Sequence, residues 1–485
     1  MMAGKTSPQL RTVTEAARHI PVLDEVDVLV AGGGLSGFAA ALAAGRNGAR
    51  TILLERNGCL GGVATATLMA NIGNRYVIAS GQQTVYGIAA EVVERLVKAG
   101  AAHPNWRRHK AIAIDSERLK VILIEMLEEA GVTVFTHALA ARPIVEGTQV
   151  RGCFFESKSG RRAILAKNTI DATGELDLAV QAGVKVVEHP GNGSLLFKLA
   201  RVDIEKFVAF LGEDPEGFPK DHDRVKDYAD FARLWREDGV LFFPHYGGKK
   251  WRFLQEAIRR GDFRAEVPPA INLDVMGMYS LGRNGTVVIN SNYYVFYRGP
   301  DIRELSRAEL HAQRMCYYVA DFLKKHVPGF EHSYVEHIGV DLGIRGLRFI
   351  QGRTMLKVEH LHGPPGPVHF DDVIATTPAE TRMAGAGGFL DYTCDLPFGA
   401  AVPSGATHLL VGSAKSICTE GGNKRLIRGM SGCMIYGQAT GTAAALAAHA
   451  DISAGEVPIR QLQAALLAQG VRLGDERRLA ELGLK

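Results

Sequence analysis

The chain has 485 residues, which is long enough to form two hydrophobic cores or one large composite core. Hydrophobic residues make up 46% of the sequence and charged residues 22%, as in an ordinary globular protein. The formal net charge of +4 is small for this length, and no long run of Lys and Arg accompanies it, so the sequence predicts no nucleic-acid partner.

The six cysteines are scattered and form no CxxC pair, which argues against an iron–sulfur cluster, a zinc site or a dithiol redox centre. No other metal site is predicted. Reduced cysteines and a charged N-terminal segment without the apolar stretch of a secretory signal favour a cytoplasmic protein. Since no apolar run reaches the length of a membrane span, we expect no membrane partner.

Residues 27–56, DVLVAGGGLSGFAAALAAGRNGARTILLER, predict a strand, a tight turn, a helix and a second strand. Gly32 permits the sharp turn, Gly34 lets backbone amides approach a pyrophosphate, and Gly37 lets the helix pack closely on the strand. Glu55 ends the second strand, where a carboxylate would accept hydrogen bonds from an adenosine ribose. The unit predicts a dinucleotide site, and by itself leaves open whether the dinucleotide is a flavin or a nicotinamide.

The next segments continue the α/β pattern. A glycine pair soon after Glu55 indicates a second close approach of the backbone to the same ligand. Hydrophobic periodicity and turn residues then predict a helix in residues 84–100, a helix from a Ser116 cap to Gly131 with a strand after it, and a hairpin with a buried strand in residues 149–173.

From about residue 196 the character of the sequence changes. Aromatic and alternating stretches such as GTVVINSNYYVFY predict a different domain with a mixed or antiparallel sheet. Ser306 and Glu309 form an S-x-x-E capping box, which predicts a long helix to about His326. After a loop at residues 361–370, a strand ending at Gly412 and a helix of small residues return to the first pattern.

Taken together, these segments resemble one family, the FAD-dependent oxidoreductases of the two-dinucleotide-binding-domain type, related to fumarate reductase flavoproteins. The resemblance spans residues 27–448, and besides the glycine unit it is carried by IDSERLKVILIEMLEEAGVTV, TIDATGELDLAVQAGV, LGIRGLRFIQG and LPFGAAVPSGATHLLVGSAKSICTEGG. It implies an α/β fold in which a discontinuous Rossmann-like FAD-binding domain carries an inserted mixed α+β substrate domain. The expected parts are the FAD-binding domain in residues 20–195 and 376–450, the substrate domain in residues 196–375 and a C-terminal helical tail in residues 451–485.

The resemblance also assigns residues to FAD. It places the pyrophosphate at the glycine turn, the adenosine ribose at Glu55, and the adenine at the backbone of Ala140, at the end of the strand after Gly131. Near the flavin end it places Gly412 and a segment from Gly437 that would bring backbone amides or a helix end towards the ring. The full cofactor-binding set is Gly32, Gly34, Ser36, Gly37, Glu55, Arg56, Gly61, Gly62, Thr65, Ala140, Thr173, Gly174, Gly412, Gly437, Gln438 and Gly441. This chain has Gly346 where related sequences often have Glu.

The sequence is compatible with three functions. The first is a redox enzyme that transfers hydride between flavin N5 and a small organic substrate held between the two domains. The second is an NAD-dependent dehydrogenase, and the third is an FAD-binding sensor or other non-redox flavoprotein. The expected partners are a small-molecule substrate and, as candidates, NAD(P)H or another electron carrier.

Five residues are candidates for catalysis. His245 and Tyr246 lie in an aromatic stretch, where a neutral His could move protons near pH 7. Arg345 and Arg348 could hold an anionic substrate through paired hydrogen bonds, although a structural ion pair is an equally good interpretation. The resemblance places Lys415 near the flavin.

Overall fold

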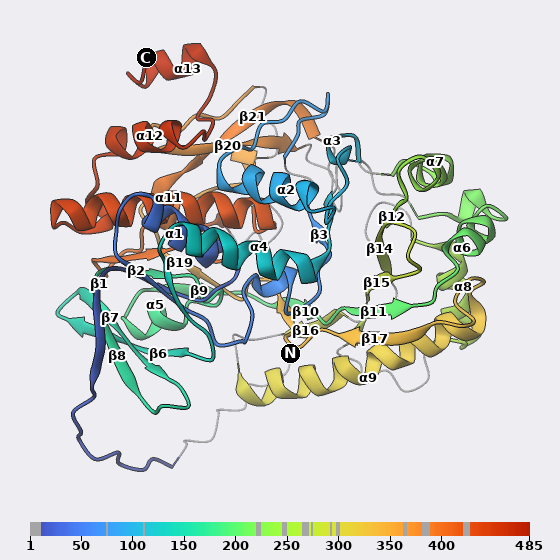
Figure 1. Ribbon diagram of the computed structural model, residues 1–485, viewed down its shortest axis with the longest axis horizontal. Helices are drawn as coiled ribbons and strands as arrows, with labels where there is room; N and C mark the ends of the chain where they lie inside the picture. The colour runs from blue at the N-terminus through green and yellow to red at the C-terminus, as the bar shows by residue number, and fades with distance from the viewer. Residues whose placement is uncertain are drawn as a thin grey trace, which may run out of the picture.

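The computed structural model consists of two lobes that lie side by side (Figure 1). It describes residues 11–73, 76–109, 112–219, 225–244, 250–263, 271–272, 275–291, 293–296, 301–361, 366–380, 389–420 and 427–485. The catalytic candidates His245 and Tyr246 fall outside these residues. Within them, no helix is both long and apolar enough to cross a membrane.

The first lobe is built on a mixed sheet, which within the described residues has seven strands in the order β5-β2-β1-β8-β7-β6, with β22 also paired to β8. The strands β5, β2, β1, β8 and β22 run parallel, whereas β6 and β7 are antiparallel additions. Since β22 follows β8 by more than two hundred residues of chain, this lobe is discontinuous, as predicted. The strands are β1 (Val22–Ala31), β2 (Thr51–Leu54), β5 (Thr133–Phe135), β6 (Leu139–Glu146), β7 (Gln149–Glu156), β8 (Arg162–Asp171) and β22 (Leu409–Val411).

Both faces of this sheet are buried, which explains the near-continuous apolar sequence of its central strand. Along β1, Val28 and Val30 pack into a large core, while Leu29 and Ala31 pack into a smaller one on the opposite face. Helices cover the large core, and two of them, α1 and α11, pack directly on each other. The α-helices of this lobe in the described residues are α1 (Leu35–Arg46), α2 (Ile88–Lys98), α3 (Trp106–His109), α4 (Ser116–Glu129), α5 (Asp177–Gln181), α10 (Val358–Leu361), α11 (Met430–Ala450), α12 (Ile459–Ala468) and α13 (Glu476–Glu481).

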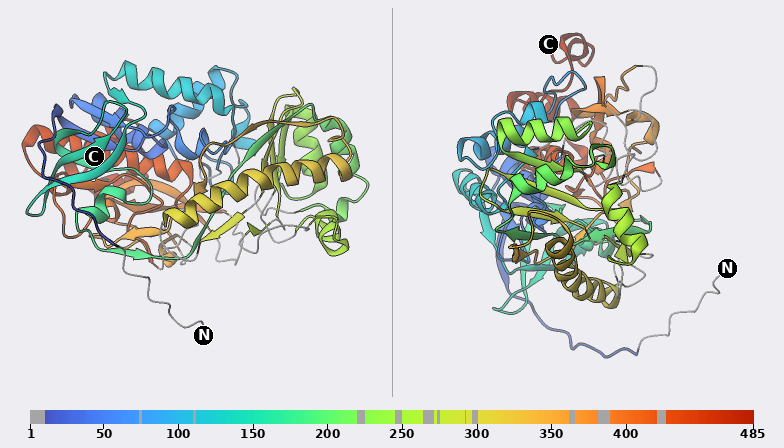
Figure 2. Two further views of the ribbon diagram at one scale, coloured as in Figure 1. Left: turned by 90° about the horizontal axis from the view of Figure 1, so that it is seen from below. Right: turned by 90° about the vertical axis from the view of Figure 1, so that its right-hand side faces the viewer.

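The second lobe contains two antiparallel sheets and the long helix α9 (Figure 2). One sheet has the order β12-β14-β15-β11-β17 and the other the order β13-β16-β10-β18. An aromatic core that includes Phe207, Phe243 and Trp251 holds the lobe together, which accounts for the aromatic sequence after residue 196. The strands are β10 (Gly191–Ser194), β11 (Phe197–Ala200), β12 (Val240–Phe243), β13 (Ile271–Asn272), β14 (Gly277–Leu281), β15 (Val287–Asn290), β16 (Tyr293–Phe296), β17 (Tyr334–Ile338) and β18 (Gly343–Ile344). The helices are α6 (Ile204–Leu211), α7 (Tyr228–Asp238), α8 (Arg252–Arg260) and α9 (Ile302–His326).

The two hydrophobic cores do not meet at residue 375, where the boundary between the substrate domain and the returning FAD-binding domain was expected. The core of the second lobe draws on Leu195–Leu347 together with Leu68 and Ala70, whereas Ile350 and Val373 pack into the first core. We therefore propose that the inserted domain ends near residue 347. Outside the larger sheets, the described residues form three strand pairs: β9 (Val186–Glu188) with β19 (Arg348–Ile350), β20 (Val373–Glu380) with β21 (Phe389–Pro397), and β3 (Asn71–Ile72) with β4 (Ile112–Ala113).

Two predicted helix starts were wrong. Helix α9 ends at His326 as expected but begins at Ile302, because the Asp301 side chain accepts hydrogen bonds from the amides of Arg303 and Glu304. Ser306 therefore lies inside the helix, and Glu309 accepts a hydrogen bond from the Leu342 amide instead, at 2.6 Å. Similarly, Asp115 caps α4 in place of Ser116. In both helices an aspartate that precedes the predicted serine in the sequence accepts hydrogen bonds from the first backbone amides. The helix therefore begins without the serine hydroxyl as its cap.

Candidate functional site

The candidate site begins at one edge of the first sheet, where four parallel strands end together. Gly32 follows β1, Glu55 follows β2, Thr173 lies two residues after β8, and Gly412 follows β22. This edge, formed by the carboxyl ends of the strands, is where ligands bind in open parallel α/β sheets. We call it the strand-end edge.

The three glycines of the turn differ in what a side chain would meet. A Cβ at Gly32 would lie 2.6 Å from the carbonyl oxygen of Ala172, and one at Gly37 would collide with the carbonyl oxygen of Gly32. At Gly34, by contrast, the nearest described atom to a Cβ would be the Cα of Gly62, at 4.0 Å. Packing within the protein therefore requires Gly32 and Gly37, whereas at Gly34 there is room for a Cβ.

Gly34 lies at the N-terminal end of α1. Among the described residues no side chain caps this helix and its first turn, which includes Ser36, carries no acid. The Gly61–Gly62 segment packs beside it, since the Gly61 amide donates to the Gly33 carbonyl at 2.9 Å. Thr65 supports that segment by donating to the Leu60 carbonyl at 2.5 Å. Uncapped amides at a helix N-terminus attract an anion such as a pyrophosphate.

Glu55 is buried beside the turn, with 6% of its surface exposed. Its two carboxylate oxygens accept hydrogen bonds from the amides of Gly33, at 2.6 Å, and Asn57, at 2.7 Å. Burial raises the pKa of the Glu55 carboxyl, and these two amides oppose that shift. Each oxygen can accept a further hydrogen bond, so the carboxylate fits the two hydroxyl groups of a ribose.

Arg56 has a partner in the other lobe. Its guanidinium pairs with Asp341 at 2.6 Å, across an exposed part of the boundary between the lobes. The structure shows this ion pair, and contact between Arg56 and a cofactor stays a prediction.

Sequence reasoning missed Asp171, the last residue of β8. Its buried carboxylate accepts four hydrogen bonds, from the amide and hydroxyl of Thr173 and from the amides of Leu178 and Ala179. It thereby holds the Thr173–Gly174 turn and the start of α5 in place. Burial raises the pKa of the Asp171 carboxyl against these hydrogen bonds. The available signal was an acid at the end of an otherwise apolar buried strand.

Other cofactor candidates lie differently from the expectation. Ala140 is the second residue of β6, since the strand after Gly131 already ends at Phe135. Gly412 directly follows β22, as expected, and its amide donates to the Asp171 carbonyl at 2.9 Å. Gly437 and Gly441 lie inside α11, where a Cβ would collide with the carbonyl oxygens of Ser36 and Ala40 in α1. They are therefore at no helix end, and close packing of the two helices requires both.

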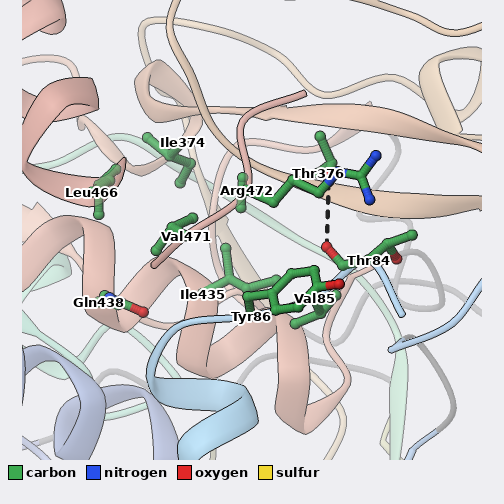
Figure 3. Close-up of a pocket in the computed structure, with 11 residues that line it drawn as sticks. Thr84, Val85, Tyr86, Ile374, Thr376, Ile435, Gln438, Leu466, Val471 and Arg472 are labelled. Atoms are coloured by element: carbon green, nitrogen blue, oxygen red, sulfur yellow. Dashed lines mark hydrogen bonds between the residues drawn. The ribbon is translucent and has the colours of Figure 1, made fainter. Parts of the chain in front are cut away.

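Gln438 is occupied by structural hydrogen bonds. Its side chain accepts from the Ile88 amide and donates to the side chain of Gln469, both at 2.9 Å. It also lines a small cavity between α11, α12 and β20 (Figure 3). With a volume of about 10 Å³ this cavity has room for one water molecule at most and cannot hold a substrate.

Lys415 and Glu175 connect the strand-end edge to the second lobe. The Lys415 ammonium lies 2.9 Å from Glu175 Oε1 and donates to the Ile344 carbonyl at 3.2 Å. Glu175 also accepts from the Leu347 amide at 2.9 Å. Gly346 has a φ of +72°, and a Cβ there would lie 2.7 Å from the Lys415 carbonyl oxygen, which explains why this chain has no Glu at that position.

The two candidate arginines have different surroundings. Arg348 donates to Glu188 at 2.9 Å across the β9–β19 pair. It thus forms a structural ion pair, which is the alternative to substrate binding that the sequence left open. Arg345 stacks on the ring of Tyr293, with 4.5 Å from the guanidinium carbon to the ring centroid, and donates to the Ser194 hydroxyl at 2.8 Å. Its Nη1 atom is buried and has no hydrogen-bond partner among the residues that the structure describes.

A mixed sheet whose parallel strands end at one edge beside a glycine turn and a buried acid is typical of dinucleotide-binding proteins. The chain belongs to the FAD dependent oxidoreductase family, whose model matches residues 27–466. Its cofactor is accordingly FAD, and the α/β fold predicted from the sequence is confirmed.

Two solved structures that resemble this chain have little sequence in common with it. A geranylgeranyl bacteriochlorophyll reductase-like protein from Thermoplasma acidophilum is 14% identical, with a TM-score of 0.41 over 92% of this chain and 87% of that chain. The p-nitrophenol 4-monooxygenase PnpA from Pseudomonas putida DLL-E4 is 10% identical, with a TM-score of 0.44 over 95% and 92% of the two chains. No curated protein matches the sequence. None of these comparisons indicates a substrate.

Proposed function

We propose that this enzyme transfers a hydride between a small anionic organic substrate and the N5 atom of FAD, with the substrate held between the two lobes. Bound FAD supplies a two-electron centre that takes up a hydride and a proton from the substrate, or returns them. The observation that carries the proposal is the half-buried guanidinium of Arg345, whose buried Nη1 atom has no hydrogen-bond partner among the described residues, in the segment that contacts the strand-end edge.

The strand-end edge fits the cofactor. We propose that the Gly34–Gly37 turn and the start of α1 bind the pyrophosphate, because Gly34 leaves space there and the first amides of α1 are uncapped. Glu55 would accept hydrogen bonds from the adenosine ribose, and Gly61 and Gly62 would lie along the same ligand. The Thr173–Gly174 turn and Gly412 follow neighbouring strands and would continue the site towards the flavin.

The second lobe supplies the groups for the substrate. Arg345 would bind an anionic group through Nη1, since Nη2 is already held by Ser194 and Tyr293 fixes the plane of the guanidinium. Lys415 would contribute a second positive charge nearby, held in place by Glu175 and by the Ile344 carbonyl. A structural ion pair is the role that we now propose for Arg348.

The first test concerns the cofactor and the chemistry together. We expect the purified protein to be yellow, to release FAD on denaturation, and to lose its flavin absorbance when an anionic substrate is added without oxygen. A screen of alcohols, amines, unsaturated acids and small aromatic compounds would cover the main substrate classes. A protein that retains FAD but shows no change in flavin absorbance with any class, in either direction, would favour the sensor alternative. A colourless protein that binds NAD and refuses FAD would contradict the proposal entirely.

A further inference from the structure

The four-stranded sheet of the second lobe has one polar face beside the first lobe. Across the β10–β18 pair Ser194 lies opposite Gly343, and the Arg345 amide donates to the Asn192 carbonyl at 2.9 Å. Because side chains alternate along a strand, Asn192 and Ser194 lie on one face together with Arg345. Gly193, between them, points the other way, towards the side chains of Leu342 and Phe296 in the lobe's own core.

This polar face is turned towards the chain that carries the glycine pair of the first lobe. A Cβ at Gly343, which shares a face with Arg345, would lie 2.9 Å from Cγ2 of Thr67. Thr67 also donates to the Asp341 carbonyl at 2.7 Å, so the two lobes are in contact here. The polar face therefore lies at the boundary of the lobes, where a substrate must lie to reach the cofactor.

Two buried polar atoms on this face lack a hydrogen bond within the described part of the chain, Arg345 Nη1 and Asn192 Oδ1. They are thus not bonded to each other, although their residues lie opposite one another on neighbouring strands. One is a charged donor and the other is an acceptor. Leaving either unpaired in a buried place costs free energy, which a ligand could recover by bonding to both.

Resting on the function proposed above, we infer that the substrate is a carboxylate with a hydroxyl or amino group on the adjacent carbon. Its carboxylate would accept from Arg345 Nη1, and its O–H or N–H group would donate to Asn192 Oδ1. A plain carboxylate would leave the Asn192 oxygen unpaired, and an apolar compound would leave both atoms unpaired. Asn192 is therefore the residue that selects the second substituent.

Oxidation of such a compound is balanced without a further reactant. The C–H bond on the carbon next to the carboxylate would break with transfer of a hydride to N5 of FAD, and the O–H or N–H bond would break with release of its proton to water. A C=O or C=N bond would form in the substrate, and the two electrons would leave with the hydride. The product is a 2-oxo acid or a 2-imino acid.

The test is isothermal titration calorimetry of the FAD-loaded protein without oxygen, using matched acids. The probes are lactate and alanine against propanoate, and 2-hydroxy-3-phenylpropanoate and phenylalanine against 3-phenylpropanoate. In at least one series we expect the hydroxy acid or the amino acid to bind about tenfold or more tightly than the plain acid, the size expected for one buried hydrogen bond. The two substituted probes then distinguish a hydroxyl from an amino group.

Variants assign the effect to residues. Asn192→Leu is expected to bind substituted and plain acids alike, Arg345→Met to lose binding of both, and Arg348→Met, the matched control, to bind as the unchanged protein does. Asn192→Asp keeps the size of the side chain and is expected to weaken the binding of every probe acid, because its carboxylate repels theirs. It serves as a second variant if Asn192→Leu does not fold.

The outcomes separate the two proposals. Equal affinity for substituted and plain acids in the unchanged protein, still lost in Arg345→Met, would overturn the substrate class and leave the anion site standing. Binding that Arg345→Met does not change, or no binding of any acid, would overturn both the inference and the anion site of the proposed function.

Discussion

The two halves of the candidate site are built from different parts of the chain. At the strand-end edge the groups that we propose to bind FAD are mostly backbone amides, positioned by glycines and by one buried acid at the end of each of two strands, Glu55 and Asp171. On the polar face of the second lobe the groups that we propose to bind the substrate are side chains from separate strands, such as Asn192 and Arg345. The first half suits a cofactor that every turnover requires, whereas side chains on a sheet face can change without changing the fold.

The largest expected effect concerns the backbone half. Gly37→Ala forces a Cβ into the Gly32 carbonyl and is expected to destabilise the protein by about 3 kcal/mol or more, since neither backbone can move freely. Gly34→Ala, the matched control, should keep the stability of the FAD-free protein and weaken FAD binding. Urea unfolding and FAD titration of both variants measure the two effects. Equal losses of stability would show that all glycines of the turn serve packing alone.

The next effect concerns the buried acid of the same half. Glu55→Ala removes the proposed acceptor for the ribose and is expected to weaken FAD binding by roughly 1–3 kcal/mol, the cost of charge-assisted hydrogen bonds left unmade. Fluorescence titration of the FAD-free variant measures this. Unchanged affinity would mean that the ribose binds elsewhere.

A smaller effect separates the two arginines of the second half. Arg345→Lys is expected to keep the fold and FAD but to lower kcat/KM at least about tenfold, because an ammonium cannot reproduce the planar fork of donors. Arg348→Lys should retain near-normal turnover, since its ion pair with Glu188 is partly exposed and contributes little. Steady-state kinetics with the substrate found in the screen decide between them. Low turnover in Arg348→Lys with near-normal turnover in Arg345→Lys would instead make Arg348 the substrate-binding residue and Arg345 the structural one.

The smallest effect is a pH dependence at the strand-end edge. Burial raises the pKa of Glu55 above its ordinary 4.5, so ionisation costs folding free energy that is absent below pH 4.5 and grows as the pH rises through the raised value. The FAD-free protein should therefore lose stability, relative to Glu55→Gln, as the pH rises through that window. Thermal midpoints of both proteins across this range are the measurement. Parallel curves would show that the pKa of Glu55 is not shifted.

Much of the first lobe could be predicted from local sequence. The glycine turn, Glu55 at the end of β2, the hairpin before β8 and the strand ending at Gly412 are all where the pattern predicted them. Each depends on neighbours within a few residues, such as a Gly that alone tolerates a close backbone approach. Two helix starts were wrong because Asp301 and Asp115 compete with a nearby serine for the same amides.

The sequence by itself thus determined the fold class, the dinucleotide unit and, through family resemblance, FAD as the cofactor. Only the tertiary structure decided which of two arginines three residues apart has a structural partner. Arg348 meets Glu188 across one strand pair and Arg345 meets Ser194 and Tyr293 across another, and each of these partners is distant in sequence. It also decided that Gly437 and Gly441 serve the packing of α11 on α1 and brought Asn192 opposite Arg345. Local patterns contain no information on such pairs, because strand register and helix packing are set by contacts over the whole chain.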